Sequence, residues 1–144
     1  NGIYDAIILS YAGIKFLNFD DKISEVFSPE QLIPSAGQGI IALQCRENDK
    51  EIITVLKKIN HHETFIRAHI ERSILKILEG DCETAIGAHS VIKGDKIIVE
   101  AELFSLDGTK RFYEKKTGKV EEFIQLGKEV GQILKTKSNN SYKR

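Results

Sequence analysis

The first side chain to consider for chemistry is the thiol of Cys82. It lies in the segment Leu78-Glu79-Gly80-Asp81-Cys82-Glu83, directly after a helical pattern. The carboxylates of this segment and the negative end of a helix dipole both disfavour a thiolate, so we expect a raised pKa for Cys82. A raised pKa argues against a nucleophile of the protease or redox type. From the residues alone, a plain loop thiol explains Cys82 equally well.

The histidines and cysteines do not form a metal-binding pattern. The sequence has no Cys-x-x-Cys, and its four histidines are not spaced to complete a site with Cys45 or Cys82. His62 and His69 lie on one predicted helix and could share a face, but two histidines alone make a weak site. We therefore predict no metal, and a thiol or metal protein based on Cys82 is disfavoured.

A second candidate is the small-residue turn Ser35-Ala36-Gly37-Gln38-Gly39. Paired glycines let a ligand approach the backbone closely, and the amides of such a turn could face an anion. The same pattern more often makes a tight connection before a strand. As a bare motif, the turn is compatible with both interpretations.

Residues 60–136 predict a complete small domain that would position Cys82. Apolar residues recur every fourth position from Ile66 to Leu78, after a capping signal at Asn60 and Glu63 and before Gly80, which indicates a helix. From Ile86 the apolar period changes to two.

Two turn signals divide this period-two region. They are Gly94-Asp95 and Asp107-Gly108, and together they indicate a three-strand meander. Apolar positions from Phe123 to Leu134 then predict a closing helix, and residues 137–144 are expected to be polar and frayed. Both helices can cover one sheet face, which gives an αβββα arrangement.

Residues 1–59 predict an incomplete unit. The apolar runs 4–9 and 40–43 are typical of buried strands, and a helix over 49–59 follows the capping pair Asn48 and Glu51. This region has too little sheet to cover these elements. The predicted fold class is therefore α+β, with a C-terminal three-stranded antiparallel sheet covered by helices, preceded by an incomplete α/β portion of a larger protein.

Composition narrows the function classes. The chain has 144 residues, 41% of them apolar, and 21 basic residues balance 21 acidic ones, so no overall charge favours nucleic acid. The apolar runs are too short to cross a bilayer and no leader pattern precedes them. With only two cysteines, which we expect to be reduced, a cytoplasmic protein is predicted.

Two separated stretches resemble porphobilinogen deaminases in order and spacing. The first, Pro34-Ser35-Ala36-Gly37-Gln38-Gly39 with Gln44-Cys45-Arg46, is similar to the family's Pro-Ala-x-Gly-Gln-Gly stretch ending in Glu-Cys-Arg. The second runs from Glu71-Arg72 through Leu78-Glu79-Gly80-Asp81-Cys82 to Ile86-Gly87-Ala88. It is similar to the family's Glu-Arg, Leu-Glu-Gly-Gly-Cys and Pro-Ile-Gly-Ala. With weaker matches elsewhere, the resemblance covers nearly the whole chain.

The resemblance implies a three-domain enzyme of haem and tetrapyrrole synthesis. Such a transferase joins four porphobilinogen molecules head to tail with release of ammonia, and frees hydroxymethylbilane by hydrolysis. Residues 1–59 would hold the end of the second domain and the segment that returns to the first. Residues 60–144 would form the C-terminal domain that anchors the cofactor.

The resemblance also assigns roles to residues. Cys82 matches the cysteine that holds a dipyrromethane cofactor through a thioether, and its electrophilic partner makes a low thiol pKa less necessary. Gln38 and Gly39 match positions lining the family's cleft, where backbone donors could meet pyrrole carboxylates, and Ser10 borders it. The catalytic aspartate lies upstream in the family, so no catalytic residue is expected in this chain, and it should be inactive alone.

The implied partners are porphobilinogen, the growing pyrrole chain and the upstream domains of the same protein. Nucleic acid and membrane are not expected, and the intact enzyme would be a monomer. Phe16 departs from the family, which usually has an arginine there, and Asp81, Gln44 and Thr84-Ala85 are further departures. The alternative is a non-catalytic binding or assembly module that keeps the αβββα domain.

Overall fold

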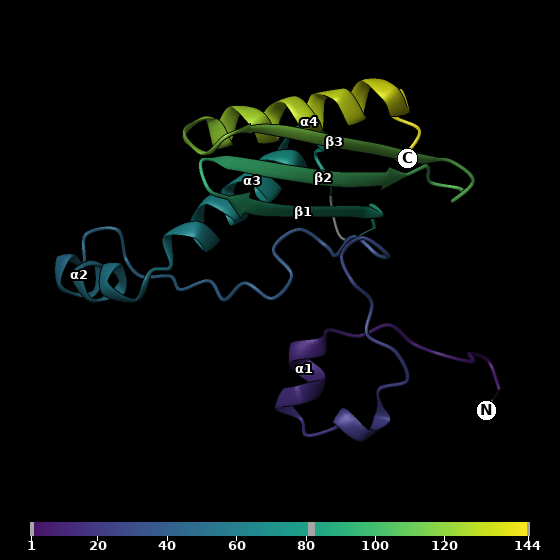
Figure 1. The fold of residues 1–144 in the computed structure, drawn as a ribbon, viewed down its shortest axis with the longest axis horizontal. Coiled ribbons are helices and arrows are strands. Elements are labelled where there is room, and N and C mark those ends of the chain that lie inside the picture. Colours follow the sequence, from purple (N-terminus) through teal and green to yellow (C-terminus); the bar gives the residue numbers. More distant parts are fainter. Residues whose placement is uncertain (1, 81–82, 144) are drawn as a thin grey trace. The chain divides into compact units, whose positions relative to one another are not determined.

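The computed structural model describes residues 2–80 and 83–143 (Figure 1). The chain divides into two compact units, Asn1–Leu32 and Ile33–Arg144. No helix in the described part of the chain is long and apolar enough to span a bilayer. The second unit holds the sheet and three of the helices, and it carries most of the candidate site.

The first unit contains two short helical elements, α1 (Tyr11–Phe16) and a 3₁₀ turn (Asp20–Lys22). The strand predicted over residues 4–9 does not form: this segment is irregular and exposed. A buried strand needs a neighbour for its backbone N–H and C=O groups. Within the described residues no strand pairs with it, so that prediction is wrong for this chain.

The second unit begins with a long connection and the helix α2 (Lys50–Ile59). The strand predicted over residues 40–43 is also absent, again with no paired neighbour among the described residues. Asp49, not Asn48, caps α2, since its side chain accepts a hydrogen bond from the Ile52 N–H at 3.2 Å. Helix α2 has one apolar face but no buried residue.

Helix α3 (His62–Leu78) confirms the predicted apolar ladder. Ile70, Ile74 and Leu78 are fully buried. The N-cap is His61, one residue after the predicted Asn60, and its ring Nδ1 accepts from the Thr64 N–H at 3.3 Å. The helix ends at Leu78.

Three strands form the predicted antiparallel meander, in the order β1-β2-β3. They are β1 (Ile86–Lys93), β2 (Lys96–Phe104) and β3 (Arg111–Lys119). Ala88 pairs with Ala101 across β1 and β2, and Glu102 with Tyr113 across β2 and β3. Alternate residues of β2, from Ile97 to Leu103, are fully buried because they face the helices.

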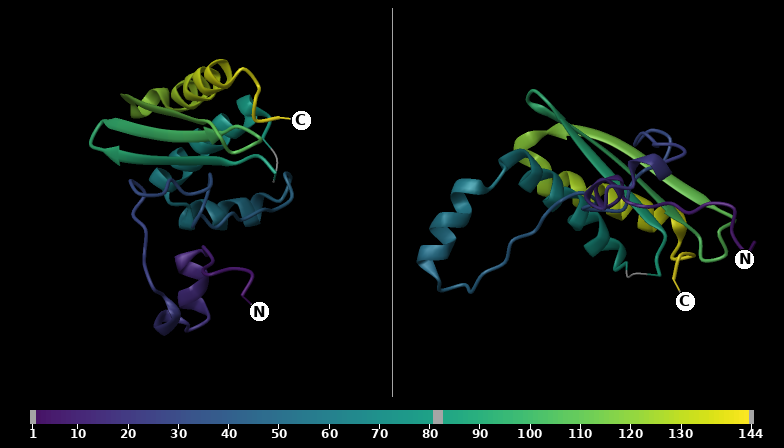
Figure 2. Two further views of the ribbon diagram at one scale, coloured as in Figure 1. Left: turned by 90° about the vertical axis from the view of Figure 1, so that its right-hand side faces the viewer. Right: turned by 90° about the horizontal axis from the view of Figure 1, so that it is seen from below.

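Helix α4 (Phe123–Ser138) packs on α3, and both cover the same face of the sheet (Figure 1; Figure 2). Two glycines allow the helices to approach. A Cβ at Gly127 would lie 2.7 Å from the Ile70 carbonyl oxygen, and one at Gly131 would lie 2.9 Å from the Ile77 Cβ. The two layers, one sheet and one pair of helices, confirm the αβββα prediction.

The C-terminal tail, residues 139–143, corrects the prediction of a frayed end. Asn139 and Asn140 adopt left-handed conformations, with φ of +46° and +58°, that turn the chain back after α4. The Leu106 N–H donates to the Ser141 carbonyl at 2.9 Å. Tyr142 is only 3% exposed and belongs to the core. The tail is therefore docked on the domain.

Candidate functional site

Cys82, the principal candidate, lies with Asp81 outside the described residues. Its described neighbours show how the chain reaches it. Glu79 adopts a left-handed conformation (φ +53°) immediately after α3, and the Gly80 N–H donates to the Leu75 carbonyl at 3.2 Å. A side chain at Gly80 would collide with Ile86, because its Cβ would lie 2.6 Å from the Ile86 Cδ1. Gly80 therefore packs closely on the end of the Ile86 side chain, which would have to shift to admit a side chain there.

The described chain after Cys82 makes a backbone hydrogen bond to the end of β2. The Phe104 N–H donates to the Ala85 carbonyl at 3.1 Å, next to the start of β1. Glu79 and Glu83, on either side of Cys82 in the sequence, are exposed.

Two cations from the end of the chain offset the negative charge predicted around Cys82. Glu79 forms ion pairs with Lys143 and, at 3.6 Å, with Lys135. The hydrogen bond from Lys143 and the charge of Lys135 hold the pKa of the Glu79 carboxyl below its usual range. These lysines could not be predicted from the sequence, since Glu79 and Lys143 are 64 residues apart and no local pattern links them.

The turn around Gln38 is confirmed as a tight connection. The Gln38 N–H donates to the Ser35 carbonyl and the Ile40 N–H to the Gly37 carbonyl, each at 3.0 Å. Gly37 and Gly39 have φ of +76° and +78°, a region that favours glycine. Gln38 and Gly39 are exposed, so a ligand could approach the backbone there.

A buried carboxylate fastens this turn to the domain. Glu71 of α3 is 3% exposed; its Oε2 accepts from the Gly37 N–H at 2.8 Å and its Oε1 from the Ser90 hydroxyl at 2.9 Å. The Ala88 N–H also donates to the Pro34 carbonyl at 2.9 Å. Both Glu71 oxygens are satisfied, as burial of a charge requires.

The role of Glu71 was not predicted. The signal available in the sequence was its place in the Glu71-Arg72 pair of the second family-like stretch. A hydrogen bond to a backbone amide 34 residues earlier leaves no periodic pattern. Only the folded structure joins the two family-like stretches.

Ser10 belongs to the first compact unit, whereas Gln38 and Gly39 belong to the second. Ser10 is exposed and occupies the N-cap position of α1, where its carbonyl accepts from the Ile14 N–H at 3.1 Å. Gln38 and Gly39 share one turn. Phe16, at the end of α1, is 86% exposed.

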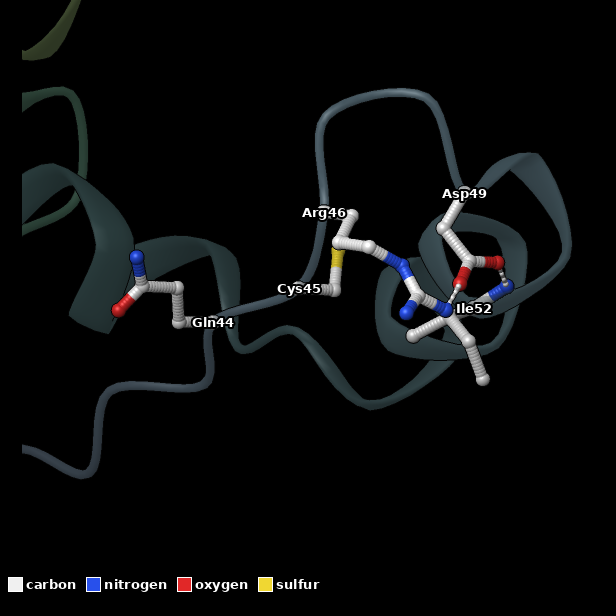
Figure 3. Close-up of a pocket in the computed structure, with 5 residues that line it drawn as sticks. All are labelled: Gln44, Cys45, Arg46, Asp49 and Ile52. Carbon is white, nitrogen blue, oxygen red and sulfur yellow. Dashed lines mark hydrogen bonds and ion pairs between the residues drawn. The ribbon is translucent and has the colours of Figure 1, made fainter.

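A shallow hollow lies beside the end of the first family-like stretch (Figure 3). It is lined by Gln44, Cys45, Arg46, Asp49 and Ile52. Arg46 pairs with Asp49 at 2.9 Å, the same carboxylate that caps α2, and Cys45 has a free thiol. Among the described residues, no group of three or more His, Cys, Asp or Glu is placed to hold a metal ion.

Two family models match the chain. "Porphobilinogen deaminase, dipyromethane cofactor binding domain" matches residues 1–54, and "Porphobilinogen deaminase, C-terminal domain" matches residues 65–136. The first description makes dipyrromethane the cofactor of the family domain to which residues 1–54 are similar.

Three curated relatives carry the name porphobilinogen deaminase. The protein of Desulforamulus reducens is 41% identical over 130 residues, which cover 90% of this chain and 42% of the relative. The protein of Coxiella burnetii is 37% identical, and the match covers 99% of this chain and 47% of the relative. The protein of Carboxydothermus hydrogenoformans is 39% identical, and the match covers 92% of this chain and 43% of the relative.

The chain therefore spans less than half the length of these curated relatives. The two models match it in consecutive segments, and the second covers the helices and sheet described above. With these matches and the identity of 37–41%, the chain belongs to the porphobilinogen deaminase family.

Proposed function

We propose that this chain is the C-terminal part of a porphobilinogen deaminase. The whole enzyme would be a transferase of haem and tetrapyrrole synthesis that joins four porphobilinogen molecules into hydroxymethylbilane and releases ammonia. The observation that carries the proposal is the match of both family models in one chain, with identity of 37–41% to relatives of that name. The proposed setting is a cytoplasmic, monomeric enzyme.

We propose that Cys82 anchors dipyrromethane through a thioether. Its sulfur would supply the electron pair for a bond to the methylene carbon of a pyrrole that has lost ammonia, and the thiol would lose its proton, so no oxidant is needed. The order Leu78-Glu79-Gly80 before Cys82 supports this role, because it resembles the stretch that precedes the anchoring cysteine in the family. When bound, dipyrromethane serves as the primer of the growing pyrrole chain.

Gln38 and Gly39 are proposed to line the cleft that receives the pyrroles, and Ser10 is proposed as a further cofactor-binding residue. The exposure of Gln38 and Gly39 supports this, as does the positive φ of Gly39, since a ligand can approach such a backbone closely. Glu71 would keep the turn in place through the Gly37 amide. The chain's own residues would thus bind and position, while catalysis belongs to upstream domains.

The division into parts is also proposed. Residues 1–59 would complete the upstream domains and residues 60–144 would form the anchoring domain. Exposed apolar side chains support the first assignment: Ile7 is 72% exposed, Leu43 59% and Ile59 63%. Such surfaces are typical of segments that pack on another part of a protein.

The decisive experiment is the intact mass of the full-length protein, produced with a supply of porphobilinogen. Wild type and a Cys45→Ala variant should both carry an adduct of dipyrromethane mass, and a Cys82→Ala variant should carry none. Cys45→Ala is the matched control, because Cys45 also lies in a family-like stretch.

An unmodified mass in folded wild type would overturn the anchor role. The alternative, a non-catalytic binding or assembly module, would then take its place. One observation favours that alternative: the exposed Phe16 stands where the family usually has an arginine that could bind a carboxylate.

A further inference from the structure

We infer that Ser90 is a positioning residue for the turn around Gln38, and that the Gly39 N–H is the backbone donor which this turn offers to a ligand. Ser90 acts on the turn through the Glu71 carboxylate. The inference rests on the proposed function in one respect: it takes the ligand at this turn to be a carboxylate of a pyrrole.

Ser90 is a polar residue at a core position of the sheet. It lies on β1 opposite Val99 of β2, and both residues are fully buried. A hydroxyl in such a place is costly unless it forms a hydrogen bond. The Ser90 hydroxyl donates to Oε1 of Glu71 at 2.9 Å. This contact accounts for a serine at a position where the alternation of β1 predicts an apolar side chain.

The Ser90 hydroxyl restricts the orientation of the Glu71 carboxylate. The two oxygens of a carboxylate lie in one plane, so a hydrogen bond to one of them limits the directions open to the other. With Oε1 bound to Ser90, Oε2 accepts from the Gly37 N–H at 2.8 Å. Without the hydroxyl, Oε1 would be buried with no donor among the described residues, which is costly. Rotation of the carboxylate would then weaken its bond to Gly37.

Strand β1 also holds the turn at a second point. The Ala88 N–H, two positions before Ser90, donates to the Pro34 carbonyl at 2.9 Å. Residue 34 is therefore bonded directly to β1, and residue 37 is bonded to β1 through Glu71. These two contacts position the residues that follow, Gln38 and Gly39, relative to the sheet.

The hydrogen bonds of the turn leave one of four successive amides free. The Gly37 N–H donates to Glu71, and the N–H groups of Gln38 and Ile40 donate to carbonyls within the turn. The Gly39 N–H has no hydrogen-bond partner among the described residues. A Cβ at Gly39 would meet no described atom within 4 Å apart from its chain neighbours, so the space beside it is open.

A free backbone N–H in open space is suited to an anionic group. Successive amides in turns of this kind form concave sites for anions. Because Glu71 occupies the Gly37 amide, a pyrrole carboxylate would meet one donor, the Gly39 N–H, in a defined position. Displacement of the turn should weaken substrate binding more than it slows later steps, since catalysis is assigned to upstream domains.

The functional test measures KM and kcat for porphobilinogen in the full-length enzyme that carries its cofactor. Ser90→Ala removes the hydroxyl, whereas the conservative variant Ser90→Thr keeps it. Ser73→Ala is the matched control, because the Ser73 hydroxyl donates to the His69 carbonyl of its own helix at 2.7 Å. The control therefore removes a serine hydroxyl close to Glu71 in the sequence without removing a partner of that carboxylate.

A second readout does not depend on activity. It is the exchange rate of the Gly37 amide, measured by NMR in the 144-residue chain for the same variants and for two changes of Glu71. Glu71→Gln keeps an oxygen for the Gly37 N–H, and its NH₂ group can donate to the Ser90 oxygen. Glu71→Ala keeps neither contact.

We expect Ser90→Ala to raise KM about three- to tenfold, to change kcat less than about twofold, and to speed exchange of the Gly37 amide about three- to tenfold. Ser90→Thr, Glu71→Gln and Ser73→Ala should stay within about twofold of wild type in both readouts. Glu71→Ala should have the largest effect on both.

Equal Gly37 exchange in Ser90→Ala and in the control would overturn the positioning role. If Ser90→Ala does not fold, Ser90→Cys takes its place, since a thiol of similar shape is only a weak donor. Faster Gly37 exchange with an unchanged KM would overturn the assignment of Gly39 as the donor to the ligand. If wild type shows neither adduct nor turnover, the proposed function fails, and the exchange rates alone decide whether Ser90 positions the turn.

Discussion

Residues 2–61 and residues 62–143 use apolar side chains in opposite ways. In the first region, all of which is described, Ile33 is the single buried residue. The second region encloses the whole of the helix-and-sheet core. The difference teaches that an apolar pattern shows which surface needs covering, but not what covers it.

Helices α2 and α3 make the contrast concrete. Both are capped by a side chain, and both have regularly spaced apolar residues. Ile74 of α3 is fully buried, whereas Val55 of α2 is 50% exposed. Since burial of apolar area is the main source of stability, α2 gains little from its apolar face in this chain.

Hydrogen exchange should show the largest difference between the two regions. We expect amides of α3, α4 and the strands to be protected at least about a hundredfold more than those of residues 2–59, because protection follows local stability. The measurement is amide exchange of the isolated chain, followed by mass spectrometry.

The same measurement on the full-length protein sharpens the result. If upstream domains cover residues 2–59, protection there should rise while that of 62–143 changes little. Equal protection of both regions in the isolated chain would contradict the comparison.

A pair of core truncations should give the next largest effect. Ile74→Ala removes a fully buried side chain and should lower the free energy of unfolding by about 2–5 kcal/mol. Val55→Ala, on α2, should change it by less than about 0.5 kcal/mol. Urea unfolding followed by circular dichroism measures both; a similar loss in the two variants would mean that α2 is part of the core.

Glycine substitutions should have a smaller effect on the free energy of unfolding, and again only the one in the second region should be destabilising. Gly127→Ala places a Cβ 2.7 Å from the Ile70 carbonyl oxygen and should cost about 1–3 kcal/mol of unfolding free energy. Gly13→Ala in α1 meets only the Ser10 Cβ at 3.9 Å and should leave the unfolding midpoint unchanged. Comparable midpoints for both variants would argue against close packing of α3 and α4.

The sequence predicted what depends on near neighbours. The Ile66 to Leu78 ladder and the meander with its turns at Gly94 and Gly108 all formed, because a helix or hairpin is specified within a few residues. The two caps were each misplaced by one residue, since Asn48-Asp49 and Asn60-His61 offer competing acceptors.

The features that could not be predicted depend on residues far apart in the sequence. The strands predicted over 4–9 and 40–43 have no paired neighbour among the described residues. The hydrogen bond from Tyr142 to the Leu78 carbonyl joins residues 64 positions apart. The hydrogen bond from the Gly37 amide to Glu71 joins residues 34 positions apart. The resemblance located the candidate site, yet only the fold showed what supports it.

Helix α3 connects the turn around Gln38 with the segment that contains Cys82. The Glu71 carboxylate accepts a hydrogen bond from the Gly37 amide in this turn. The last residue of the helix, Leu78, precedes the segment that contains Cys82. The eight residues from Glu71 to Leu78 span about 10 Å along the helix axis, at 1.5 Å per residue. Ile74 and Leu78 of this part of the helix are fully buried, so the helix that follows the turn's attachment point is fixed in the core. One well-packed helix therefore supports both the turn that contains Gln38 and the residue at which the chain leaves α3.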